Sequence, residues 1–137
     1  MTYCLGIITC HGLVMAADSR TNAGVDHVST YRKLFDFSRS SDRPTKNDRV
    51  LILCTSGNLS ITQATITALQ EDLQDPEREN LHNIVNIAEA ARYIGQTLRG
   101  IQDREQAWLE KDGIDYHCNF LLGGQIRSEE RRVGKEC

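Results

Sequence analysis

Thr2 follows the initiator methionine directly and offers the first chemistry in this sequence. If Met1 is removed, one residue holds both a hydroxyl group and a free α-amine, and the amine can take the hydroxyl proton while the oxygen attacks a carbonyl. An α-amine has an ordinary pKa of about 7.7–8.0, nearer to neutral pH than the value of about 10.4 for lysine, which favours it as a general base. Many chains begin Met-Thr without this role, so downstream residues must support the hypothesis.

Three further residues lie where expected strands begin or end. Asp18 ends the second expected strand, Lys33 begins the third, and Gly57 stands at a strand-to-helix turn. Taken singly, an aspartate before a turn, a surface lysine and a turn glycine are ordinary features. Their order behind a threonine at position 2 favours one shared site.

The histidines and cysteines show no metal-ligand spacing. His11, His27, His82 and His117 are scattered, and only His27 is near the candidate site in sequence. The five cysteines form no Cys-x-x-Cys pair, and their odd number is typical of reduced thiols. We therefore expect neither a metal nor a cofactor.

The composition argues against several classes of partner. A net charge of −3 and a pI near 5.8 do not indicate nucleic-acid or anionic-membrane binding. No apolar run approaches the ~18–20 residues of a membrane span, and no signal peptide opens the sequence. We predict a cytoplasmic protein.

Two short apolar runs at the start of the chain predict a hairpin. They cover 3–10 and 13–17 and flank His11-Gly12, a dipeptide typical of a tight turn. Both runs are almost continuously apolar, so we expect both of their faces to be buried. A polar turn is expected at 19–24.

The middle of the chain predicts two more strands and a loop. A third strand is expected near 33–37, and a surface loop at 38–49, which contains a proline. The apolar run 50–54 predicts a buried strand that ends in Thr55-Ser56-Gly57.

Two helices should follow this strand. Ser60 and Gln63 form a possible capping box for the first, which must end before Pro76. The second is expected over 81–102 or further because apolar residues recur at helical spacing. Its predicted buried stripe is Ile84, Ile87, Ala88, Ala91, Ile94, Leu98 and Ile101.

A last strand is predicted over 116–122, with Gly123-Gly124 after it. The order of strands, then two helices, then a strand predicts an α+β fold in which a helix pair covers a mostly antiparallel sheet.

The stretch AADSRTNAGVDHVSTYRKL, together with Thr2 and Gly57, closely resembles the proteasome-type N-terminal-nucleophile peptidases. The nearest match is the bacterial Anbu (ancestral β-subunit) branch. The resemblance covers about 2–126 and is most specific at 18–24 and 31–33. It implies a four-layer αββα sandwich, of which this chain would hold only the first half.

The resemblance assigns a role to each candidate catalytic residue. Thr2 Oγ would be the nucleophile, with its freed α-amine as base through a water molecule. Lys33 would favour the alkoxide-like state, and Asp18 would pair with Lys33 and orient it. The Gly57 main-chain N–H would donate to the developing oxyanion.

The resemblance also implies how substrate binds. Arg20, Thr21 and Asn22 would lie along an unfolded polypeptide or peptide as an extra strand. Thr55 would face the pocket for the residue before the cut, and this small uncharged side chain sets no demand for a charged substrate residue. Like subunits would associate into a homo-oligomer.

Two departures from the family pattern qualify this expectation. The spacing from Thr2 to Lys33 is one residue shorter than in most proteasome β-type chains, and a supporting serine and aspartate of the family would lie beyond this sequence. We therefore expect the 137-residue chain to be inactive and not stably folded by itself. Two alternatives remain open: a catalytically silent scaffold subunit, and an N-terminal-nucleophile amidase acting on small amides.

The stretch 127–137, RSEERRVGKEC, is rich in charge and continues no earlier pattern. It resembles the translation of a sequencing adapter. We expect 1–126 to be the N-terminal half of a proteasome-type peptidase domain and 127–137 to be a non-native tail.

Overall fold

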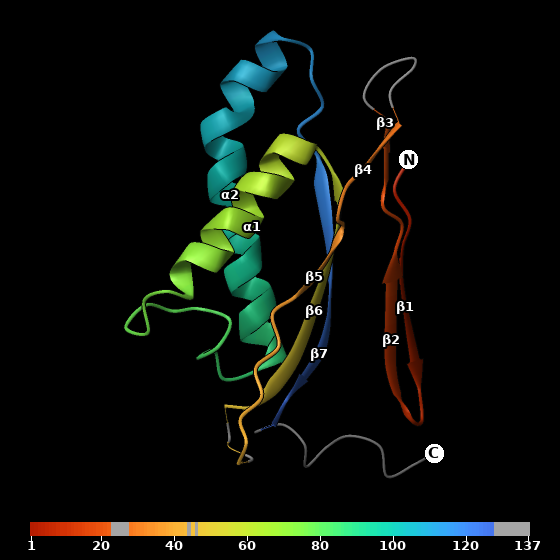
Figure 1. Ribbon diagram of the computed structural model, residues 1–137. Helices are drawn as coiled ribbons and strands as arrows, with labels where there is room; N and C mark the ends of the chain where they lie inside the picture. The colour runs from red at the N-terminus through yellow and green to blue at the C-terminus, as the bar shows by residue number, and fades with distance from the viewer. Residues whose placement is uncertain (23–27, 44, 46, 128–137) are drawn as a thin grey trace.

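The computed structural model describes residues 1–22, 28–43, 45 and 47–127. Its fold is α+β, as the sequence predicts, and every strand pair among these residues is antiparallel. Figure 1 shows a helix pair on one face of a central sheet and a hairpin on the other face.

The hairpin consists of β1 (Cys4–Thr9) and β2 (Gly12–Ala17). Thr9 pairs with Gly12, so the connecting turn is Cys10-His11 rather than the predicted His11-Gly12. Gly12 instead begins β2 with a φ of 145°, a conformation that glycine adopts without steric cost.

The prediction that both hairpin faces are buried is wrong. The inner face packs on the central sheet, where a Cβ on Gly123 would meet Met15 Sδ at 2.3 Å. The absence of a side chain at Gly123 therefore allows the hairpin and the sheet to approach each other closely. On the outer face Leu5, Ile7 and Val14 are exposed.

A second hairpin-like pair, β3 (Arg20–Asn22) and β4 (Val28–Thr30), follows the first. The predicted polar turn at 19–24 is therefore wrong for the three residues of β3. Ser19 lies between β2 and β3, while positions 23 and 24, and also His27, lie outside the described residues.

The central sheet has the order β5-β6-β7, formed by β5 (Leu34–Asp36), β6 (Arg49–Gly57) and β7 (Cys118–Ile126). Two expected boundaries change. Arg49 is buried in β6 rather than part of a surface loop, and Gly123-Gly124 lies within β7.

Helices α1 (Leu59–Asp72) and α2 (Ile87–Lys111) cover the sheet. The cap of α1 is Asn58, whose side chain accepts from the Ile61 N–H at 3.0 Å, so the predicted Ser60–Gln63 capping box is wrong. Helix α2 starts later than predicted because Asn86 caps it by accepting from the Glu89 N–H at 2.8 Å.

The hydrophobic core lies between these helices and β6. Leu51 and Leu53 of β6 are fully buried and form one cluster with residues of both helices. The predicted stripe on α2 is correct at Ile94 and Ile101, which are buried. It is wrong at Ala88 and Ala91, which are exposed, while the helix buries Ala90 and Tyr93 in their place.

Neither helix among the described residues is long and apolar enough to cross a membrane. The same residues include no group of three or more His, Cys, Asp or Glu side chains that could hold a metal ion.

Candidate active site

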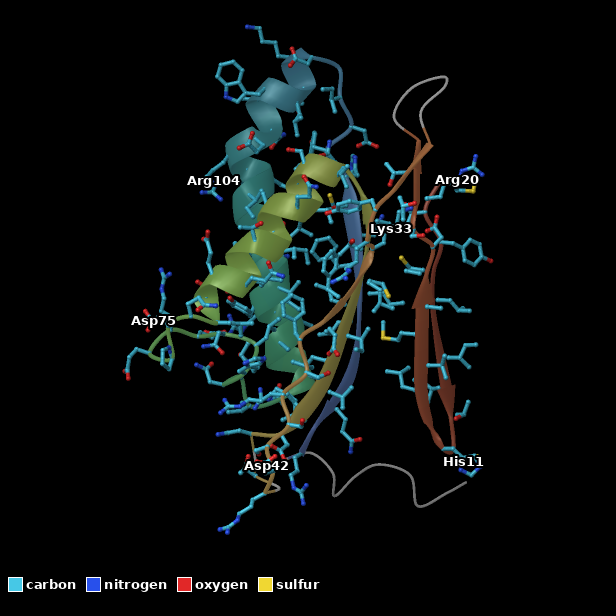
Figure 2. All side chains as sticks on the ribbon, viewed as in Figure 1. His11, Arg20, Lys33, Asp42, Asp75 and Arg104 are labelled. Carbon is cyan, nitrogen blue, oxygen red and sulfur yellow. The ribbon has the colours of Figure 1, made fainter. Side chains whose placement is uncertain are left out.

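The candidate site centres on Lys33, whose side chain is only 7% exposed. Its ammonium donates to both carboxylate oxygens of Asp18 at 3.1 Å and to the Arg20 carbonyl at 2.6 Å. A buried lysine needs such partners, because an ammonium taken from water without a counter-charge is strongly destabilised. Figure 2 shows Lys33 between the central sheet and the hairpin layer.

Asp18 also holds the start of the chain in place. Its carboxylate accepts from the Tyr3 N–H at 2.8 Å, and its own N–H donates to the Tyr3 carbonyl at 3.0 Å. The pKa of Asp18 lies below its usual range, mainly because the carboxylate accepts from the Tyr3 N–H. The hydrogen bond and the positive charge of Lys33 lower this pKa further. The carboxylate therefore links the lysine to the residue that follows Thr2.

Lys33 is fixed through its main chain as well. Its carbonyl accepts from the Thr55 N–H at 2.8 Å, which joins the start of β5 to the end of β6. Thr55 is 1% exposed. The lysine thus connects the sheet to the hairpin layer.

A pocket of about 190 Å³ opens beside the lysine. It brings together five of the predicted site residues: Thr2, Thr21, Lys33, Thr55 and Gly57. Of the other three, Asp18 binds Lys33 by its side chain, Arg20 does so by its carbonyl, and Asn22 contributes main chain to β3.

The backbone at position 57 requires a glycine. Its φ is 106°, and an added Cβ would lie 2.1 Å from the His117 carbonyl oxygen and 2.7 Å from Cys118 Cα. The start of β7 therefore leaves no room for a side chain. This backbone conformation is sterically costly for any other residue.

Several pocket residues were missed by the sequence reasoning: Met1, Tyr31, Ser56, Leu59 and Thr62. Leu59 and Thr62 lie in the first turn of α1, three residues apart and hence on one helix face. Because the helix begins directly after Gly57, this spacing was the sequence signal that could have placed Leu59 and Thr62 beside the site. Tyr31 stands in the stretch that carries the family resemblance.

The pocket is rich in hydroxyl groups. Thr21 Oγ1 is buried and has no hydrogen-bond partner among the described residues. Among the described residues, Lys33 is the one charged side chain in the lining, and its charge is compensated by Asp18.

Thr2 lies in the pocket with its nitrogen still joined to Met1, which is fully exposed. In this form the Thr2 nitrogen is an amide and cannot act as a base. Removal of Met1 would leave the hydroxyl, a free amine and the Lys33 ammonium at one pocket. This set suits attack on a carbonyl carbon.

Several solved structures are similar to this chain in sequence and in fold. "Anbu (ancestral beta-subunit) from Yersinia bercovieri" is 40% identical, with a TM-score of 0.78, over 94% of this chain and 49% of its own. "Helical Assembly of the Anbu Complex from Pseudomonas aeruginosa" is 35% identical, with a TM-score of 0.78, over 92% of this chain and 48% of its own.

A "Gly-1" mutant of Anbu from Hyphomicrobium sp. strain MC1 is 33% identical, with a TM-score of 0.75, over 94% of this chain and 48% of its own. The chain therefore spans about half the length of the solved relatives it matches. Neither the protein-family models nor the curated proteins gave a match.

Proposed function

The chain belongs to the Anbu (ancestral β-subunit) branch of proteasome-like proteins, and on that premise we propose that it is part of a threonine-type peptidase subunit. The observation that supports this most is the buried Lys33 ammonium, paired with Asp18 at the pocket that contains Thr2. The pair also fastens the hairpin layer to the sheet, but its place at the pocket that contains Thr2 favours a catalytic role over a purely structural one.

In the proposed reaction, Met1 is first removed. The Thr2 oxygen then forms a bond to the substrate carbonyl carbon while its proton passes to the Thr2 α-amine. Lys33 stabilises the developing negative charge on the nucleophile, and Asp18 keeps the ammonium in place. The Gly57 N–H donates to the oxyanion; loss of such a donor typically costs ~10²–10³ in rate.

The peptide C–N bond then breaks as the amine proton passes to the leaving nitrogen. Water hydrolyses the resulting ester and frees Thr2. The main chain of Arg20, Thr21 and Asn22 would lie along the substrate, and Thr55 would contact the side chain before the cut.

The complete protein would supply what this stretch lacks. We propose that the full-length subunit completes a four-layer αββα sandwich and associates with like subunits in the cytoplasm. The helical assembly named for the Pseudomonas aeruginosa relative supports self-association.

The test uses protein expressed at the full length of its gene. Intact-mass analysis should show loss of Met1 and, after treatment with an electrophilic peptide inhibitor, a covalent adduct. Thr2→Ala should abolish the adduct, and Lys33→Met should reduce it by orders of magnitude while leaving Met1 removal unchanged.

A protein that loses Met1 yet forms no adduct would contradict the peptidase proposal and favour a silent scaffold. Release of small acylated amines without cleavage of unstructured peptides would favour an amidase instead.

A further inference from the structure

Two cysteines lie on strands of adjacent layers, Cys4 on β1 of the hairpin and Cys54 on β6 of the central sheet. In β6, Leu53 and Thr55 point to one face, and Leu53 belongs to the core under the helices, so Cys54 points to the opposite face, where the hairpin lies. Cys4 is on β1 and half-buried, while Cys54 is fully buried. Figure 2 shows sulfur atoms gathered between these two layers.

The contacts of the two thiols bring them together. Cys4 Sγ lies 3.6 Å from the carbonyl oxygen of Thr55, the residue after Cys54. Each thiol also influences the pKa of the other, as expected for neighbouring side chains. Both are free thiols, and the hairpin packs directly on β6.

We propose that Cys4 and Cys54 form a dithiol site that a peroxide converts to a disulfide, joining β1 to β6 beside the candidate active site. In the first step the Cys4 sulfur bonds to one peroxide oxygen, the O–O bond breaks, and a sulfenic acid and water result. In the second step the Cys54 sulfur attacks the Cys4 sulfur and releases a second water. Two thiols are oxidised, and one hydrogen peroxide is reduced to two waters.

The difference in burial assigns the order of events. Cys4 is the thiol that solvent reaches, so it meets the oxidant, and the enclosed Cys54 resolves the sulfenic acid. Burial raises the pKa of both thiols; the Asp18 carboxylate adds to this effect at Cys4, and the Lys33 ammonium opposes it. Because the thiolate is the reacting form, oxidation should accelerate as pH rises.

The cross-link would also act on the candidate site. Cys4 lies two residues after Thr2, and Cys54 directly precedes Thr55 in the pocket lining. A disulfide would draw the Cys4 sulfur away from the Thr55 carbonyl. It would also fix β1, which follows Thr2 in the chain, against β6, whose last residues line the pocket. We expect severalfold slower reaction of Thr2 with an electrophile in the oxidised protein, an effect that rests on the proposed function.

The experiment treats the native full-length protein with hydrogen peroxide, alkylates the remaining thiols and maps peptides by mass without reduction. The expected product joins the peptides of Cys4 and Cys54, is lighter by two hydrogen atoms, and is reversed by dithiothreitol. Cys118→Ser is the matched control and should leave this cross-link unchanged. Cys54→Ser should leave Cys4 as a sulfenic acid that a dimedone probe traps.

The deciding measurement is made on wild-type protein, so it does not depend on whether any cysteine variant folds. Recovery of Cys4 and Cys54 as alkylated thiols, or a Cys4 bridge to Cys10 or Cys118, would overturn the inference. The two proposals fail separately: a missing adduct in reduced protein counts against the peptidase, and a missing cross-link counts against the dithiol.

Discussion

At the scale of single residues, the pairing of Lys33 and Asp18 explains why a charged side chain is buried in this fold. The ammonium has three oxygen neighbours, two from Asp18 and one from the Arg20 main chain. The carboxylate in turn accepts from the Tyr3 N–H. Loss of one partner would leave the other charge enclosed without compensation, which usually destabilises a protein more than loss of the whole pair.

Asp18→Asn should lower the melting temperature near neutral pH and flatten its dependence on acid. Because the folded-state pKa of Asp18 lies below its ordinary value, the carboxylate contributes stability that is fully present above the unfolded pKa of about 3.9. This contribution is lost as pH falls through the folded pKa. Melting temperatures of wild type and variant, measured across acid pH, should therefore converge at the acid end; a constant difference would contradict the assignment.

Gly57→Ala tests the close approach of β7 to the end of β6. A Cβ at this position meets main-chain atoms rather than a flexible side chain, and the backbone has a positive φ. We expect a loss on the order of 3 kcal/mol in the free energy of unfolding of the full-length protein, measured by urea denaturation. Gly100→Ala is the control, since nothing lies within 4 Å of its Cβ and α2 should gain about 0.5–1 kcal/mol.

The sequence located much of the site but not its walls. Thr2, Lys33, Thr55 and Gly57 could be found because each stands beside a strand end or in the stretch that resembles the family. Pocket lining such as Ser56 and Thr62 depends on how β6 meets α1; helical spacing places Leu59 and Thr62 on one face but does not show that this face lines the pocket. The proximity of Cys4 and Cys54 could not be predicted either, because they are fifty residues apart in sequence and lie in two different sheets.

At the scale of elements, β6 joins the pocket to the far side of the domain. Its last residues line the pocket, while Arg49 at its other end is buried and donates to carbonyl groups of the segment between the helices. The distances are 3.1 Å to the Leu81 carbonyl and 2.6 Å to that of Ile84. The guanidinium thus satisfies main-chain oxygens that α2, starting only at Ile87, leaves free of helical bonds.

Arg49→Met should remove these bonds while keeping much of the apolar stem. We expect a loss on the order of 2–3 kcal/mol in the free energy of unfolding, since hydrogen bonds to charged groups contribute about 1.5–3 kcal/mol each and some of this is recovered by relaxation. Hydrogen exchange at 81–86 should accelerate more than exchange in β7. Arg39→Met, at an exposed residue, is the control; equal effects of both variants would refute the role of Arg49.

Element boundaries show where sequence patterns lose their power. The predicted second helix began at 81 because apolar residues continued the helical period there. The chain instead forms turns until Asn86, whose cap and the carbonyl bonds of Arg49 favour a later start. Apolar spacing described the α2 core only in part, because Ala88 and Ala91 fit the period but face solvent. Fold class was predictable, whereas the start of α2 depended in part on the tertiary contacts of Arg49.

At the scale of the whole molecule, the outer face of the hairpin is an exposed apolar surface. Ile7 and Val14 pair across the hairpin and are 47% and 58% exposed. The chain covers only about half of its solved relatives, and contiguous exposed apolar strands favour association.

The 137-residue chain should therefore self-associate in sedimentation velocity experiments. Ile7→Lys combined with Val14→Glu keeps a favourable cross-strand pair and should shift the distribution toward monomer. Ile114→Lys, at an exposed apolar residue away from the hairpin, is the control and should change little. A monomeric wild-type chain with a cooperative melt would contradict this expectation and the predicted instability of the isolated stretch.

The double attachment of Lys33 makes its side-chain nitrogen a natural reporter. The carbonyl of this residue is bonded to Thr55 in one layer, while its ammonium is bonded to Asp18 and Arg20 in the other. Any slippage between the layers must stretch one attachment or the other. Such slippage should change the ¹⁵N chemical shift of the Lys33 ammonium, because it changes the hydrogen bonds of this group. The alignment of the two layers could therefore be followed with isotope labelling alone.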